Sequence, residues 1–163
     1  MMNKALNDRP NVVIFPPIIL ATTVVLACIL QWLSPLGQLA ILTQVIRVAV
    51  GAAVMIAGVC LVAAGRRLLV RLGTNVSPLQ PTTVLATGGV FRWTRNPLYS
   101  GGTLVMVGVA LVFALDWLIL LLVPSALILH YGVVVREEQY LERKFGDQYR
   151  LYKLRVPRYG FGI

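Results

Sequence analysis

Residues 39–64 read LAILTQVIRVAVGAAVMIAGVCLVAA, an apolar run in which Arg47 is the one charged residue. An α-helix rises about 1.5 Å per residue, so this run can cross the hydrocarbon core of a bilayer, which is about 30 Å thick. Backbone polar groups in lipid must be satisfied within their own segment, which favours a helix over a strand or loop. The stretch therefore predicts a membrane-spanning helix.

Three further apolar runs, at 12–33, 98–115 and 117–135, have the same character. The chain is 58% hydrophobic and only 13% charged, far from the soluble average of about 25% charged. We predict an all-α, single-domain membrane bundle (1–163) of about four transmembrane helices. The first run lacks the small-residue cleavage site of a signal peptide, so we expect it to be retained as a span.

Small residues mark one face of the second predicted helix. Gly51, Gly58 and Gly65 recur every seven residues, which keeps them near one stripe of a helix. Glycines on such a stripe let the backbone of another helix approach closely. We expect this face to be a helix–helix contact.

Lysine and arginine are concentrated in three segments. Two precede the first apolar run, five lie in 65–97, and seven lie from Arg136 onward, whereas the turns at 34–37 and 116–117 have none. The positive-inside rule then predicts a cytoplasmic location for both termini and the central loop, in a bacterial-type inner membrane or a plasma membrane. The net charge of +9 fits anionic lipid headgroups, and we predict no nucleic-acid partner.

Several common types of functional site are excluded by the sequence. His130 is the single histidine, Cys28 and Cys60 lie isolated in apolar runs, and no HExxH is present, so we predict no metal site. P-loop, strand-associated GxGxxG and GxSxG patterns are also missing, which argues against soluble nucleotide-binding and hydrolase folds.

Two polar clusters could carry chemistry. Residues 94–99, TRNPLY, place a cation, an amide and an aromatic ring around a helix-starting proline, where free N–H groups can receive an electron-rich ligand group. An interfacial cap anchored by Arg95 is an equal alternative. Glu137 and Glu138 follow the fourth apolar run, where we expect its helix to leave the membrane and continue as a cytoplasmic helical segment. A solvated, salt-bridged face is the alternative there.

Taken together, TTVLATGGVFRWTRNPLYSGG (82–102), the adjacent glutamates and FGDQYRLYKLRVPR (145–158) resemble the isoprenylcysteine carboxyl methyltransferase family of membrane enzymes. The resemblance covers nearly half of the chain. It implies S-adenosylmethionine as the cofactor, held in a cytoplasm-facing pocket, and a lipophilic substrate that enters from the bilayer. A carboxyl group is one candidate for the methyl acceptor.

The resemblance also implies site residues. Asn96, Pro97, Leu98 and Tyr99 match the family's His-Pro-x-Tyr cofactor motif with asparagine in place of histidine, and asparagine does not titrate. Glu137 matches the glutamate that meets the positively charged methionine part of the cofactor. The full set that we expect at the cofactor is Thr83, Val84, Leu85, Ala86, Phe91, Asn96, Pro97, Leu98, Tyr99, His130 and Glu137.

The residues expected at the acceptor are less well matched. Val133 stands where the carboxyl methyltransferases have an arginine that holds the substrate carboxylate. Arg95 and Arg136 are candidate substitutes, and Glu138 could assist with the proton of an amine acceptor. We therefore predict Arg95, Arg136 and Glu138 as catalytic residues.

Other functions stay open at this level. Phospholipid-type N-methylation uses the same cofactor chemistry, and some sterol reductases resemble this C-terminal architecture while using NADPH. A membrane protein that keeps the fold without enzymatic activity is a further alternative. The sequence does not indicate the oligomeric state, and the partners that we expect are membrane lipids and the lipophilic substrate.

Overall fold

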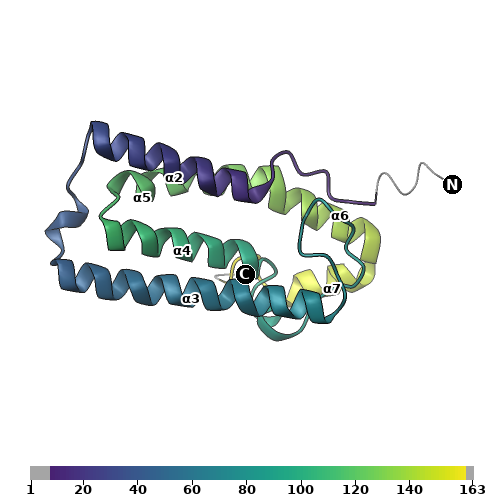
Figure 1. Ribbon diagram of the computed structural model, residues 1–163. Helices are drawn as coiled ribbons and strands as arrows, with labels where there is room; N and C mark the ends of the chain where they lie inside the picture. Colours follow the sequence, from purple (N-terminus) through teal and green to yellow (C-terminus); the bar gives the residue numbers. More distant parts are fainter. Residues whose placement is uncertain (1–7, 161–163) are drawn as a thin grey trace.

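The computed structural model describes residues 8–160, and this part of the chain is helical and has no strands. Its elements, in chain order, are α2 (Pro16–Leu33), the 3₁₀ turn η1 (Leu39–Ile41), α3 (Gln44–Arg71), the 3₁₀ turn η2 (Gly89–Arg92), α4 (Pro97–Phe113), α5 (Asp116–Leu129), the π-helical turn η3 (His130–Val134), α6 (Val135–Phe145) and α7 (Asp147–Arg155). Figure 1 shows α2 to α5 side by side, with α6 and α7 at one end.

Three helices in the described range are long and apolar enough to cross a membrane. They are α2, α3 and the continuous helix Asp116–Phe145, which joins α5, η3 and α6. α4 is apolar too but has 17 residues. The all-helical fold is thereby confirmed, with three helices suited to spanning a membrane, while the count of four spanning helices and the cytoplasmic position of the C-terminal segment stay predictions.

The second helix differs from its predicted limits of 39–64. It begins at Gln44 and continues to Arg71, and residues 39–41 form the separate turn η1. The carboxylate of Asp116 accepts hydrogen bonds from the backbone N–H groups of Gly37 at 3.1 Å and Leu39 at 2.7 Å. These bonds hold the connection in a turn, so the helix starts later than the apolar run does.

Prolines and a left-handed residue set the other helix ends. α2 begins at Pro16, four residues inside the run predicted from 12, and α4 begins at Pro97; each proline occupies the first helical turn, where its missing N–H costs nothing. α4 ends at Phe113 rather than 115 because Ala114 is left-handed, with φ of 54°. The predicted fourth span, 117–135, lies within a helical run that continues to Phe145.

The four long helices pack as two pairs, and only one of these pairs consists of helices that are consecutive in the sequence. α3 packs chiefly on α4, and α2 packs on α5 (Figure 1), so the two helices that the turn at 34–37 connects are not each other's main packing partners. A buried hydrogen bond of 2.6 Å between the hydroxyls of Thr23 and Ser125 links α2 to α5. Such polar links are a common means of joining helices in a membrane.

The glycine stripe explains why α3 pairs with α4. Gly51, Gly58 and Gly65 are the buried residues of α3, as the seven-residue repeat predicts. A Cβ placed on Gly58 would lie 2.6 Å from the carbonyl oxygen of Gly101 and 2.8 Å from the amide nitrogen of Val105. The two backbones are thus in direct contact, and α4 is held against α3 along its length.

This contact makes a stability prediction. Gly101→Ala would place a Cβ 2.8 Å from the backbone oxygen of Gly58, so we expect a loss of about 1–3 kcal/mol in the free energy of unfolding. Gly102→Ala is the matched control, because its Cβ would meet only Leu20 Cδ1, at 3.6 Å. Thermal unfolding in detergent should show destabilisation for the first variant and none for the second. Equal effects of the two would contradict the close packing.

Candidate active site

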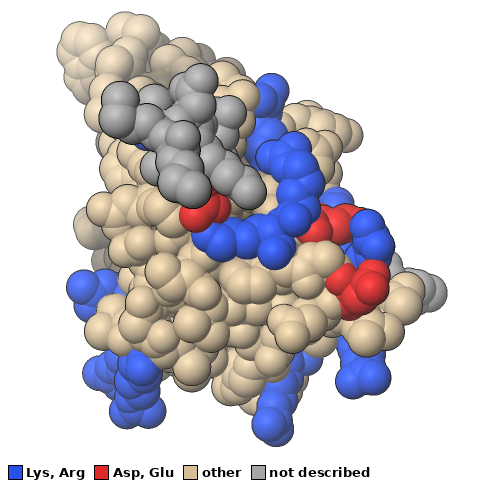
Figure 2. Space-filling model, turned by 90° about the vertical axis from the view of Figure 1, so that its right-hand side faces the viewer, with Lys and Arg blue, Asp and Glu red and all other residues tan. Residues whose placement is uncertain are grey.

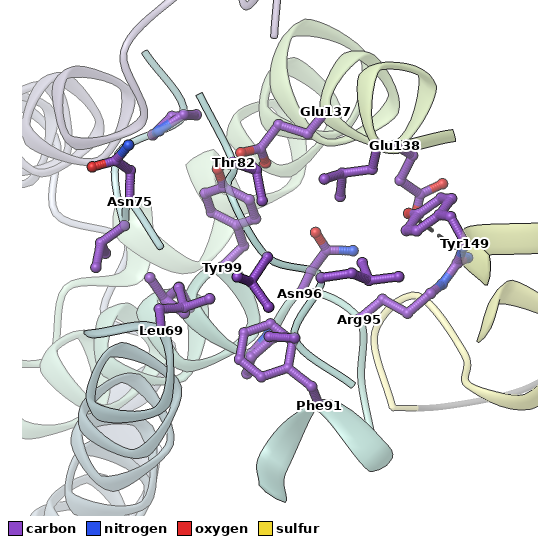
Figure 3. Close-up of a pocket in the computed structure, with 18 of the residues that line it drawn as sticks. Leu69, Asn75, Thr82, Phe91, Arg95, Asn96, Tyr99, Glu137, Glu138 and Tyr149 are labelled. Atoms are coloured by element: carbon purple, nitrogen blue, oxygen red, sulfur yellow. Dashed lines mark hydrogen bonds and ion pairs between the residues drawn. The ribbon is translucent and has the colours of Figure 1, made fainter. Parts of the chain in front are cut away.

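A cavity lies at the end of the bundle that carries α6 and α7, beneath the connection between α3 and α4. Its volume is about 110 Å³, and it opens to solvent. Its walls come from the end of α3, the loop before η2, the start of α4, and α6 and α7 (Figure 3). Segments far apart in sequence therefore share one site.

Most of the residues that the sequence singles out line this cavity. They are Val84, Leu85, Ala86, Phe91, Arg95, Asn96, Pro97, Leu98, Tyr99, Glu137 and Glu138. The TRNPLY block and the paired glutamates are therefore parts of one site rather than two separate surfaces.

Glu138 is the centre of a buried ion cluster. Arg158 binds it with both arms of its guanidinium, with Nε 3.0 Å from Oε1 and Nη2 2.7 Å from Oε2. Arg95 Nη2 lies 3.3 Å from Oε1, and the side chains of Arg95 and Glu138 are only 9% and 6% exposed. The cluster joins the start of α4, α6 and the C-terminal tail. Both oxygens of Glu138 are engaged, so its carboxylate holds these three segments together.

Glu137 has a different environment. Its Oε2 accepts a hydrogen bond of 2.7 Å from the hydroxyl of Tyr99, and no lysine or arginine in the described part of the chain forms an ion pair with it. Figure 3 shows Glu137 on the opposite side of the cavity from Arg95. A partly buried carboxylate without a cation favours a positively charged ligand group, because such a partner would offset its desolvation.

Arg95 is only partly satisfied by its contact with Glu138. Its Nε and Nη1 are buried and have no hydrogen-bond partner among the described residues, although Arg95 lines the cavity. Buried guanidinium donors without partners are costly and unusual. The same cavity therefore holds an unpaired carboxylate and a cation with unused donors.

Asn96 is oriented by the C-terminal tail. Its Nδ2 donates to the backbone carbonyl of Arg158 at 3.2 Å, and the hydroxyl of Thr94 donates to the same carbonyl at 2.8 Å. Because a carbonyl only accepts, the amide nitrogen must be on that side, which leaves the amide oxygen as a free acceptor. Figure 3 shows Asn96 between Tyr99 and Arg95.

The loop above the cavity is fastened at two points. Thr74 Oγ1 accepts from the backbone N–H of Thr83 at 3.0 Å, and the hydroxyl of Tyr140 accepts from the N–H of Thr82 at 3.1 Å. Thr83 does not line the cavity; its hydroxyl donates to the carbonyl of Gly73 at 3.0 Å. Its observed contacts stabilise the loop.

Two other predicted residues also lie outside the cavity lining. His130 lies in the π-helical turn η3, and its Nδ1 is 2.8 Å from the hydroxyl of Tyr159. Arg136 Nη1 donates to the backbone carbonyl of Asn11 at 3.2 Å, which ties α6 to the segment before α2. The structure therefore brings neither side chain to Glu137 or Arg95.

Sequence reasoning missed several lining residues, namely Leu69, Asn75, Val76, Ser77, Pro78, Thr82, Leu141, Tyr149 and Tyr152. Burial raises the pKa of the Tyr149 and Tyr152 hydroxyls, which therefore stay protonated donors at neutral pH. The hydroxyl of Tyr152 donates to the carbonyl of Phe91 at 2.7 Å and so anchors η2. The spacing of the two tyrosines on one helix face was a usable signal, whereas the residues at 75–78 had none.

Comparison with known families decides the kind of protein. The family described as phospholipid methyltransferase matches residues 46–148, well over half of the chain. The chain belongs to this family. The resemblance predicted from the sequence is thereby confirmed, because this family is part of the same group of membrane methyltransferases. Comparison with curated proteins and with solved structures gave no significant match.

Membership makes the chain a membrane methyltransferase. The matched range contains both glutamates, Arg95 and the whole of α4, whereas Tyr149, Tyr152 and Arg158 follow it. The cavity therefore combines the part shared with the phospholipid methyltransferase family and the tail that closes it.

Replacing each of the two glutamates is predicted to change the stability of the protein to a different extent. Glu138→Gln leaves the buried guanidinium of Arg95 and the partly exposed guanidinium of Arg158 without a carboxylate, and it should lower the free energy of unfolding by about 3 kcal/mol. Glu137→Gln keeps an acceptor for the Tyr99 hydroxyl, so it should change the free energy of unfolding by less than about 1 kcal/mol. Thermal unfolding of both variants in one detergent compares them directly, and a larger loss for Glu137→Gln would overturn these assignments.

Proposed function

We propose that this protein transfers a methyl group from S-adenosylmethionine to a lipophilic, membrane-partitioned substrate. One observation carries the proposal: the cavity holds the unpaired carboxylate of Glu137 and the unused donors of Arg95. A free amino-acid group, with an ammonium and a carboxylate, is complementary to this arrangement, and S-adenosylmethionine has one.

The residues present fit this cofactor. Glu137 would meet its positive charge, the Nε and Nη1 of Arg95 would donate to its carboxylate, and the amide oxygen of Asn96 offers a further acceptor. Phe91 and Leu98 add apolar wall for the rest of the molecule. When bound, S-adenosylmethionine supplies a methyl group on a positively charged sulfur.

The protein's own contribution is positioning in a partly dry site. Tyr99 holds the Glu137 carboxylate through a hydrogen bond of 2.7 Å, and the ion cluster of Glu138 keeps Arg95 in place. Holding reacting groups in alignment while excluding water supplies much of the catalysis that a direct displacement needs. Asn96 does not act as an acid or a base in this reaction, because its side chain does not titrate.

Among possible acceptors, an amine is better supported than a carboxylate. Val133, at the position of the substrate-binding arginine in the carboxyl methyltransferases, is fully buried in an apolar cluster with Ile19 and Leu129. Arg136, a candidate replacement, bonds to the backbone of Asn11. The phospholipid methyltransferase family match is compatible with N-methylation of a lipid amine.

We further propose that the end of the bundle with the cavity faces the cytoplasm. All lysines and arginines except Arg47 belong to segments that the positive-inside rule assigns to that side. A cofactor dissolved in the cytosol would then enter from water, and the substrate from the bilayer.

Binding measurements on the purified protein test the cofactor. We expect S-adenosylhomocysteine to bind and NADPH not to bind, because the pocket matches an amino-acid group. Glu137→Gln should weaken the binding of S-adenosylhomocysteine by roughly 10- to 100-fold, because a charge-assisted contact is lost. Glu142→Gln, which removes the same charge from a carboxylate paired with Arg150 and Lys153, is the control. Binding of NADPH alone would favour a membrane reductase, and binding of neither would favour a non-enzymatic role.

The acceptor is tested on the product. Membranes containing the protein should produce a labelled lipid when supplied with radiolabelled S-adenosylmethionine. Mild base should not release the labelled methyl group, because an N-methyl amine is stable under these conditions. Release of the label as methanol would instead identify a methyl ester and would contradict the amine acceptor while leaving the cofactor assignment intact.

A further inference from the structure

A second hollow lies outside the cavity, on the surface of the α3–α4 pair. It is an open groove of about 400 Å³, and its walls are Val59, Val62 and Ala63 of α3 and Val105 of α4. Arg66 and Arg67 complete the lining at the end nearer the cavity. Apolar walls that end at two guanidinium groups match an acyl chain attached to an anionic headgroup.

The groove follows from the glycine contact between the two helices. Gly58 and Gly101 bring the backbones together, and Val62 and Val105 flank that crossing. Val62, Arg66 and Leu69 then follow one another at helical spacing on one face of α3, and Leu69 lines the cavity. Groove and cavity are therefore successive sites along the same face of α3.

The two arginines have no counter-charge from the described part of the chain. Both are exposed, and neither is within ion-pair distance of a carboxylate. The chain's acids have other partners: Asp8 with Lys144, Asp116 with Gly37 and Leu39, Glu137 with Tyr99, Glu138 with Arg95 and Arg158, and Glu142 and Asp147 with Arg150. Figure 2 shows basic groups at the lower left and bottom centre of this end of the molecule with no acidic group beside them.

We propose that the groove is a binding site for an anionic phospholipid. Its acyl chain lies over Val59, Val62 and Val105, and its phosphate is bound by Arg66 and Arg67. Arginine recognises phosphate oxygens with two parallel donors, and it lies here where an interface headgroup would be. This site is separate from the cofactor cavity and does not depend on the reaction proposed for it.

Native mass spectrometry of the full chain in detergent, titrated with lipid, tests the site. We expect one phosphatidylglycerol to bind at least about tenfold more tightly than phosphatidylcholine of the same chains, because two cations act on the headgroup charge. The double variant Arg66→Gln/Arg67→Gln should lose this preference. Arg143→Gln/Arg155→Gln removes the same charge from exposed positions elsewhere and should keep it.

A second variant separates the groove from general charge effects. Ala63→Phe fills the groove without altering charge and should also abolish tight binding, with the fold checked by thermal unfolding. Equal affinity for the two lipids, or equal losses in both double-arginine variants, would overturn the proposal. So would a protein dimer whose formation covers the groove and persists without lipid.

Discussion

The buried carboxylate of Glu138 joins three segments that are distant in the sequence: α6, the start of α4 through Arg95, and the tail through Arg158. Two charged hydrogen bonds to Arg158 satisfy both oxygens, so the cluster tolerates burial that a single pair would not. Because neighbouring residues on a helix point about 100° apart, fixing Glu138 also directs Glu137 to a different side. One glutamate builds the site and leaves the other for a ligand.

The rest of the fold brings these charges to the end of an apolar bundle. The glycine contact of α3 with α4 holds Pro97 and Leu98 against Gly65, immediately beside the cavity. The tail returns to the same place, where the backbone N–H of Arg95 donates to the carbonyl of Pro157 at 3.0 Å. A polar pocket thus adjoins an apolar surface, which suits the proposed reaction between a cofactor from water and an acceptor from lipid.

Much of this organisation could be predicted from the residues, because hydrophobic runs and helical periodicity are local properties. The glycine repeat indicated a close helix contact, and the TRNPLY block with the glutamates indicated seven of the twenty residues that line the cavity. The pairing of α2 with α5, the late start of α3 and the bonds of Arg158 depend on contacts between distant segments. His130 and Arg136 stay predicted site residues; in the structure they contact Tyr159 and Asn11, outside the cavity lining.

The central claim is that Glu137, which has no cationic partner among the described residues, and Arg95, which has two donors without partners there, together recognise an amino-acid group. A structure of the protein bound to S-adenosylhomocysteine tests this claim most directly. The account predicts the ammonium of the ligand within hydrogen-bond distance of Glu137 and its carboxylate at Nε or Nη1 of Arg95, with the Glu138 cluster unchanged. A ligand bound elsewhere, or one in this cavity whose amino-acid group contacts neither residue, would contradict it.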